Sequence, residues 1–115
     1  MTYRPISAYH AHIYFTPDTR PLAERLRAGL AEHFPTARLG RWHDVPVGPH
    51  THAMYQVLFT LDLFATLTPY LMLHRDGLAI LLHPDTGDDL ADHTAHAVWF
   101  GEILPLKLDV LRKAD

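Results

Sequence analysis

Polar and apolar residues alternate with a period of two along the segment 8–15, where His10, His12 and Tyr14 are separated by apolar residues. This period predicts a β-strand whose apolar side chains face the core, with the histidines on the opposite face. The next pattern, over residues 21–33, has leucines at every fourth position and charged residues between them. That spacing predicts an amphipathic helix, which Pro35 ends.

The middle of the chain continues with strand-like and helix-like segments. Strands are expected over residues 37–43 and 53–60, and a nearly unbroken apolar run over 78–83 is typical of a buried strand. Between the last two, residues 61–74 form an apolar segment typical of a helix, in which Pro69 either kinks the helix or restarts it.

The C-terminal part is expected to extend this core. Asp88 can cap a short helix that carries His93 and His96, a further strand is expected over residues 97–100, and residues 104–111 form an apolar tail without a clear period. The order strand, helix, strand, strand, helix, strand is that of the split βαβ plan. We therefore expect one α+β domain over residues 1–115, ferredoxin-like, with helices on one face of an antiparallel sheet and a C-terminal extension.

Composition narrows the class of protein. The 115 residues are 48% hydrophobic and 20% charged, with a net charge of -3, so a nucleic-acid footprint is not expected. We expect no membrane partner, because no apolar stretch approaches the roughly 20 residues that span a bilayer, and a cytoplasmic location, because residues 1–5 lack a signal-peptide pattern. The chain has no cysteine, so nitrogen and oxygen must supply any metal ligands.

The ten histidines are the candidate chemistry. The predicted topology makes the first and last core strands neighbours, which brings His10 and His12 towards His83. A loop stiffened by Pro46 and Pro49 carries His50 to the same area. Neutral imidazole is the commonest metal ligand and also titrates near neutral pH, so a metal site or an acid–base site is indicated. The alternative is a set of half-buried histidines at a dimer interface or on a solvated sheet face.

Three stretches carry a family resemblance: YHAHIYF at residues 9–15, GRWHDVPVGPH at 40–50 and HPDTGDDLADH at 83–93. Together they resemble the DOPA 4,5-dioxygenase family, in the expected order and over nearly the whole chain. The resemblance implies a ferredoxin-like homodimer that cleaves a catechol ring with O2 at a non-haem metal, usually iron(II). The chain departs from the family pattern at Thr51, where proline is usual, and carries Asp85 where asparagine is common.

The resemblance favours particular roles for the histidines. His10, His12 and His83 are expected to be the metal ligands, with His50 as a fourth ligand or an acid–base group. His93 lies in the third family stretch and is a candidate for catalysis from outside the ligand shell. None of the carboxylates has the spacing of a ligand in a two-histidine, one-carboxylate triad, so an all-histidine site is one of the options.

Three further residues are candidates for substrate binding. Arg41 could hold a substrate carboxylate through two hydrogen bonds, although a solvated strand residue is an equal reading. Trp42 and Tyr55 could line an aromatic pocket, although aromatic residues usually belong to a core.

The leading hypothesis is therefore an extradiol dioxygenase acting with O2 on a catechol with a charged side chain, such as DOPA. Iron(II) is the expected cofactor, and zinc, manganese or nickel could occupy the site in purified protein. Two rivals stay open. One is a histidine acid–base enzyme, either a monooxygenase or an isomerase, and the other is a protein that binds a small aromatic molecule or a metal without catalysis.

Overall fold

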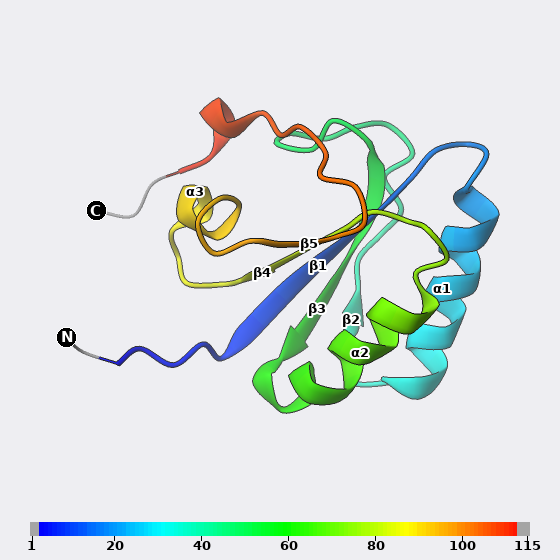
Figure 1. Ribbon diagram of the computed structural model, residues 1–115, viewed down its shortest axis with the longest axis horizontal. Helices are drawn as coiled ribbons and strands as arrows, with labels where there is room; N and C mark the ends of the chain where they lie inside the picture. The colour runs from blue at the N-terminus through cyan, green and yellow to red at the C-terminus, as the bar shows by residue number, and fades with distance from the viewer. Residues whose placement is uncertain (1–2, 113–115) are drawn as a thin grey trace.

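The computed structural model describes residues 3–112, which form a twisted sheet with helices packed on it (Figure 1). The elements, in chain order, are β1 (Ala8–Phe15), α1 (Arg20–His33), β2 (Arg38–Leu39), β3 (Ala53–Thr60), the 3₁₀ turn η1 (Leu61–Leu63), α2 (Phe64–His74), β4 (Ile80–Pro84), α3 (Asp89–Asp92), β5 (Val98–Phe100) and the 3₁₀ turn η2 (Leu108–Val110). None of the helices within these residues is long and apolar enough to cross a membrane.

The sheet has the strand order β2-β3-β1-β4-β5, and every neighbouring pair is antiparallel. The first four strands follow the split βαβ plan, because β1 and β2 are joined through α1 and β3 lies between them. β5 adds a fifth strand beyond β4. The predicted α+β ferredoxin-like class is thereby confirmed, including the predicted contact between β1 and β4.

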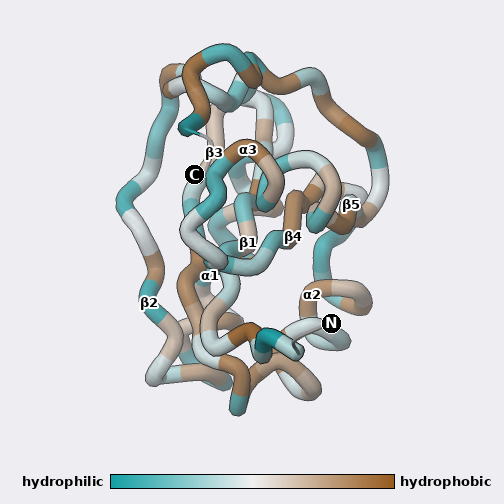
Figure 2. The backbone as a smooth tube through the Cα atoms, turned by 90° about the vertical axis from the view of Figure 1, so that its left-hand side faces the viewer, coloured by the Kyte–Doolittle hydropathy of each residue, from teal (hydrophilic) through white to brown (hydrophobic). Residues whose placement is uncertain are grey.

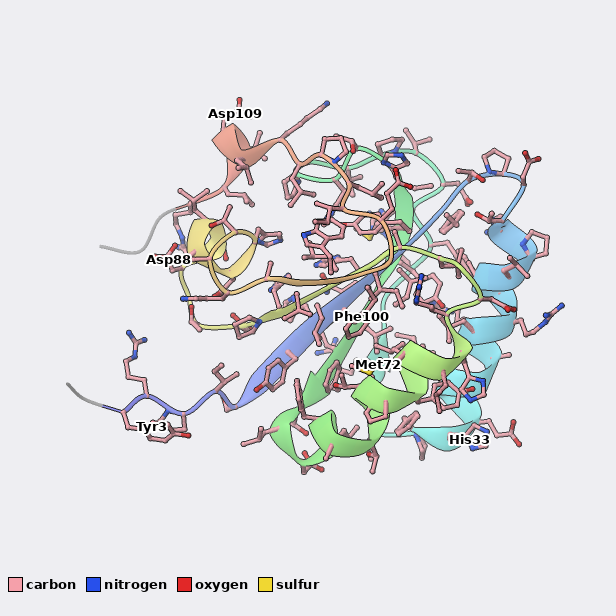
Figure 3. All side chains as sticks on the ribbon, viewed as in Figure 1. Tyr3, His33, Met72, Asp88, Phe100 and Asp109 are labelled. Carbon is pink, nitrogen blue, oxygen red and sulfur yellow. The ribbon has the colours of Figure 1, made fainter. Side chains whose placement is uncertain are left out.

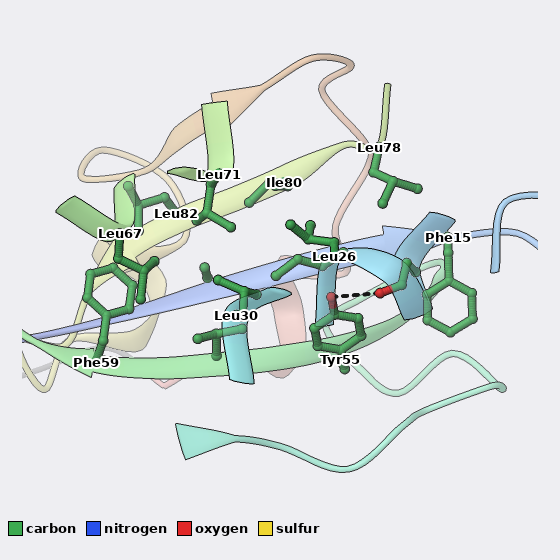
Figure 4. Close-up of a cluster of buried hydrophobic side chains, with 14 residues drawn as sticks. Phe15, Leu26, Leu30, Tyr55, Phe59, Leu67, Leu71, Leu78, Ile80 and Leu82 are labelled. Carbon is green, nitrogen blue, oxygen red and sulfur yellow. Dashed lines mark hydrogen bonds between the residues drawn. The ribbon is translucent and has the colours of Figure 1, made fainter. Parts of the chain in front are cut away.

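The main core lies between the sheet and helices α1 and α2 (Figure 4). Leu26 and Leu30 of α1, and Leu67 and Leu71 of α2, point into it, as their spacing of four residues requires. From the sheet, this core takes the apolar set of each strand, including Ile13 of β1. The other side chains of the same strands must therefore face the opposite side of the sheet.

The opposite face of the sheet is covered by α3 and the C-terminal segment. Figure 1 shows these elements on the far side of the sheet from α1 and α2, and Figure 2 shows α3 in front of the ends of β1 and β4. A second, smaller apolar cluster forms here from Tyr14, Met54, Leu81 and Leu104. This covered face is where the histidines of β1 and β4 lie.

Two segments differ from the sequence prediction. The strand expected over residues 37–43 is regular only at Arg38–Leu39, and the chain touches β3 again through the bridge between His43 and Met54. Between these two points the Gly40 N–H still donates to the Gln56 carbonyl, so the segment follows β3 without forming a regular strand. Pro69 does not restart the helix, because it lies inside α2, which is continuous from Phe64 to His74.

Candidate metal centre

Strand pairing places three histidines on one face of the sheet. His10 and His12 share a face of β1, and His83 of β4 lies directly opposite His10 in the antiparallel register. The Nε2 atoms of His12 and His83 are 3.0 Å apart. The approach of these three side chains, predicted from topology, is therefore present in the fold.

A loop delivers His50 to the same face. The Gly48–Pro49 peptide bond is cis, and the His50 N–H donates to the carbonyl of Val47 in a tight turn. His50 then forms a bridge with Leu106 of the C-terminal segment. The ring of His50 comes to 4.3 Å from that of His12, centroid to centroid, so the loop histidine belongs to the cluster.

The short helix α3 places a fifth histidine, His93, in the cluster. Asp88 caps this helix, because its side chain accepts a hydrogen bond from the Ala91 N–H. Figure 3 shows Asp88 beside α3. His93 follows at the helix end, with its ring 4.2 Å from the ring of His83. The cap therefore fixes the direction from which His93 enters the cluster.

The five histidines form two overlapping groups of possible metal donors. One group is His10, His12 and His83, and the other is His12, His50 and His93. In each group, the donor atoms lie within 4.8 Å of one another. Both groups, as found within residues 3–112, consist of histidines alone.

Hydrogen bonds set the tautomers of two of these rings. His83 Nδ1–H donates to the Pro84 carbonyl oxygen at 2.8 Å, and His93 Nδ1–H donates to the Asp89 carbonyl oxygen at 2.7 Å. In a neutral imidazole, the Nε2 atom then carries a lone pair. Metal-binding histidines are typically oriented in this way, by a backbone carbonyl that accepts the other ring N–H.

Burial keeps three of the clustered histidines neutral. Desolvation, followed by repulsion from neighbouring histidines, lowers the pKa of His12 well below its usual value. Desolvation, again helped by neighbouring histidines, lowers the pKa of His50 to about 4. The pKa of His83 also falls to about 4, mainly through desolvation, although the hydrogen bond to Pro84 opposes the shift. These three rings are therefore unprotonated at neutral pH, as metal coordination requires.

Two observations indicate that the donors fit a metal ion. Nitrogen donors at about 2.0–2.1 Å from one ion stand roughly 3 Å apart when they are adjacent ligands, which matches the separation of the His12 and His83 Nε2 atoms. His12 Nδ1 is also buried without a hydrogen-bond partner among the described residues. A carboxylate also approaches this donor group, since Asp85 Oδ2 lies 3.5 Å from His10 Nε2.

A cavity of about 770 Å³ reaches the edge of the cluster. His83 and Asp85 line it beside the first donor group, and Tyr9 and Phe64 contribute aromatic walls. Its volume is in the range of small-molecule sites. Of the five clustered histidines, His83 lines this cavity.

The proposed substrate residues lie elsewhere. Tyr55 is opposite Ile13 in the sheet register, so its ring is fully buried in the main core, where its hydroxyl donates to the Ala23 carbonyl (Figure 4). Trp42 packs edge-on against Tyr55 in the same core. Arg41 is exposed on the edge segment that follows β2. The structure does not bring these three residues to the histidine cluster.

Sequence reasoning missed two polar residues of this face. The Tyr14 hydroxyl lies 2.7 Å from His50 Nδ1, and its place in the alternation of His10 and His12 was the available signal. Asp92 is buried beside the cluster and bonds Thr86 and His96. Its only sequence signal was its position next to His93 in the third family stretch.

Comparison with known proteins adds independent information. A profile of the Dopa 4,5-dioxygenase family matches residues 9–110. The chain is 35% identical to an uncharacterized 21.2 kDa protein of Botryotinia fuckeliana, over 92% of its length. It is 34% identical to a DOPA 4,5-dioxygenase of Amanita muscaria, over 90% of its length. The chain spans 64% and 49% of the lengths of these two relatives.

A solved structure shares the fold. It is a provisionally named dioxygenase of Nostoc punctiforme PCC 73102, with a TM-score of 0.88 and 46% identity. The similarity covers 90% of each chain.

Proposed function

The chain belongs to the Dopa 4,5-dioxygenase family, and from that premise we propose that it is a non-haem, metal-dependent extradiol dioxygenase. The proposed reaction is cleavage of the ring of a catechol, such as DOPA, with O2. Membership of the family supports an oxygenase. The observation that carries the finer proposal is the cluster of neutral imidazoles beside a cavity of small-molecule size.

We assign the metal to His10, His12 and His83 rather than to the second donor group. Both groups have suitable atoms, but only the first has a member, His83, on the wall of the cavity. A metal that meets substrate needs open positions on the substrate side. Iron(II) is the proposed cofactor, and zinc, manganese or nickel would compete for the same nitrogen donors in purified protein.

The remaining residues of the cluster would handle protons. A ferrous ion at this site would supply a Lewis acid that holds the catechol oxygens and a redox centre for O2. His50, hydrogen-bonded to the Tyr14 hydroxyl, can exchange a proton through that contact. His93 is held by the Asp89 carbonyl and faces His83, where its free Nε2 can accept a proton.

The cavity suggests how a catechol would be oriented. His83 marks the end at which the diol would lie, and the substrate ring would extend from there into the cavity. Arg4 also lines the cavity, so it replaces Arg41 as the proposed partner for a substrate carboxylate. The side chain of the substrate would then point away from the histidines.

One observation favours a second candidate, a binding protein without catalysis. His12 Nε2–H can donate to His83 Nε2, so the cluster can close on itself through a hydrogen bond without any metal. The rival histidine acid–base enzyme would use the same rings and would be indifferent to metal.

The test is oxygen uptake, with parallel spectra, by ferrous-reconstituted protein given a panel of catechols that includes DOPA. The proposal expects one O2 per catechol and a new yellow chromophore, both lost with an iron chelator and regained with ferrous salt. Activity that ignores the chelator would support the acid–base enzyme. Thermal stabilisation by catechols without oxygen uptake would support the binding protein.

The expected homodimer, which rests on the family resemblance, and the expected cytoplasmic location are further parts of this proposal. Light scattering of the purified protein would test the dimer, and imaging of the tagged chain would test the location.

A further inference from the structure

A buried carboxylate, Asp92, is hydrogen-bonded to two residues that line the cavity, Thr86 and His96. Asp92 is 2% exposed. It accepts hydrogen bonds from the Thr86 N–H at 2.8 Å and from the Thr86 hydroxyl at 2.7 Å. Its Oδ1 also lies 2.9 Å from His96 Nδ1. Burying a carboxylate costs free energy unless its partners compensate the charge. The presence of Asp92 at this position therefore suggests a functional role.

The charged form of Asp92 is favoured despite its burial. Desolvation acts to raise the pKa of Asp92, but hydrogen bonds from His96 and Thr86 outweigh it and hold that pKa below its usual value. The same hydrogen bonds tie Asp92 to Thr86 and His96, two residues that line the cavity. Asp92 is therefore an anion that can stabilise a cation on His96.

His96 connects this anion to the cavity. Its side chain is 46% exposed, and it lines the cavity together with His83 and Thr86. Because an ionised Asp92 only accepts hydrogen bonds, His96 must donate its Nδ1–H. The Nε2 atom of the neutral ring then carries a lone pair. An imidazole held in one tautomer by a buried carboxylate is the arrangement of a general base.

We propose that His96, positioned by Asp92, is the catalytic base that deprotonates the substrate in the cavity. This inference rests on the proposed function, because it takes the substrate to be a catechol. In the step, the O–H bond of one catechol hydroxyl breaks and an N–H bond forms at His96 Nε2. The oxygen keeps the electron pair, and Asp92 stabilises the resulting imidazolium. Nothing is oxidised or reduced in this step.

A structural role for the pair makes a different prediction. Asp92 already joins the loop at Thr86 to α3, and His96 could simply add a third hydrogen bond to that joint. His96→Gln separates the two roles, because a glutamine amide can still donate to Asp92 but cannot act as a base. His33→Gln is the matched control, since His33 lies at the end of α1, on the opposite side of the molecule from Asp88 and α3 (Figure 3).

The experiment mixes ferrous-loaded protein with a nitrocatechol under argon and follows the absorbance change of ionisation by stopped flow. Loss of a general base typically costs 10²–10⁴-fold. We expect His96→Gln to slow the ionisation phase at least tenfold, with unchanged metal content and thermal midpoint, while His33→Gln behaves as wild type. Added imidazole should restore the rate in His96→Ala.

Equal ionisation rates in wild type and His96→Gln would overturn the inference, and so would a nitrocatechol that does not bind wild type. This readout needs no oxygen. A protein that ionises the probe through His96 but consumes no O2 with any catechol would refute the proposed dioxygenase and leave the base assignment standing.

Discussion

Acidification should destabilise the metal-free protein through its buried histidines. The pKa values of His50 and His83 are about 4 in the folded chain, mainly because of desolvation, against 6.5 for an unperturbed imidazole. Between these values the unfolded chain binds protons that the folded chain does not. The free energy of unfolding therefore rises with pH across this window and falls as the pH drops from 6.5 towards 4.

The size of the effect follows from the same values. At pH 5 an unfolded histidine is nearly all protonated and a folded one with a pKa of about 4 is mostly neutral, which costs about 2 kcal/mol per ring relative to pH 7. His50 and His83 together should remove about 4 kcal/mol on this basis, and His12, whose pKa is also lowered, adds to the loss. Domains have only about 5–15 kcal/mol in total.

The assay is urea unfolding of chelator-treated protein at pH 7, 6 and 5, followed by tryptophan fluorescence. His83→Gln should reduce the difference between pH 7 and pH 5 by at least about 2 kcal/mol, because His83 also contributes to the lowered pKa of His50. The exposed residue His33 provides the control, and His33→Gln should keep the wild-type pH dependence. Equal stability at pH 5 and pH 7, or an unchanged difference in His83→Gln, would refute the reasoning.

Three other outcomes are expected. His12→Ala should abolish metal binding, measured by elemental analysis. His52→Ala is the control and should retain the metal, because His52 belongs to neither donor group. Metal retained in His12→Ala would exclude the proposed ligand set. Tyr14→Phe should cost about 1–3 kcal/mol in urea unfolding by removing a buried partner of His50, with metal content unchanged and oxygen uptake reduced. Leu30→Ala should cost about 3 kcal/mol without changing metal content; lost metal would tie the main core to the site.

Local sequence patterns were sufficient for the part of the site that lies on strands. Alternation in β1 fixes the common face of His10 and His12, and the split βαβ order makes β4 the neighbour of β1. The same rule could have placed Tyr55 correctly. It alternates with Val57 and Phe59, and this set faces the main core because Tyr55 is opposite Ile13.

Long-range contacts decide the parts that the sequence could not define. The edge segment after β2 is not a regular strand and is held to β3 by the Gly40 N–H, which donates to Gln56, and by a bridge at His43; the residue types of the segment do not predict this. In the sequence, nothing distinguishes Asp92 from other carboxylates in a helix turn. Its burial and its hydrogen bond from Thr86 depend on the folded loop. The position of His50 likewise depends on a partner far along the chain.

The loop that carries His50 is bonded to residues 105–107 of the C-terminal segment. Two hydrogen bonds hold this loop. The Lys107 N–H donates to the Pro49 carbonyl, and the Thr51 hydroxyl donates to the carbonyl of Pro105, 54 residues further along the chain. The second of these hydrogen bonds needs the Thr51 hydroxyl, which a residue without a side-chain donor could not replace. The position of His50 in the cluster therefore depends on residues 105–107 as well as on its own loop, so a change in the C-terminal segment would reach the histidines without touching any of them.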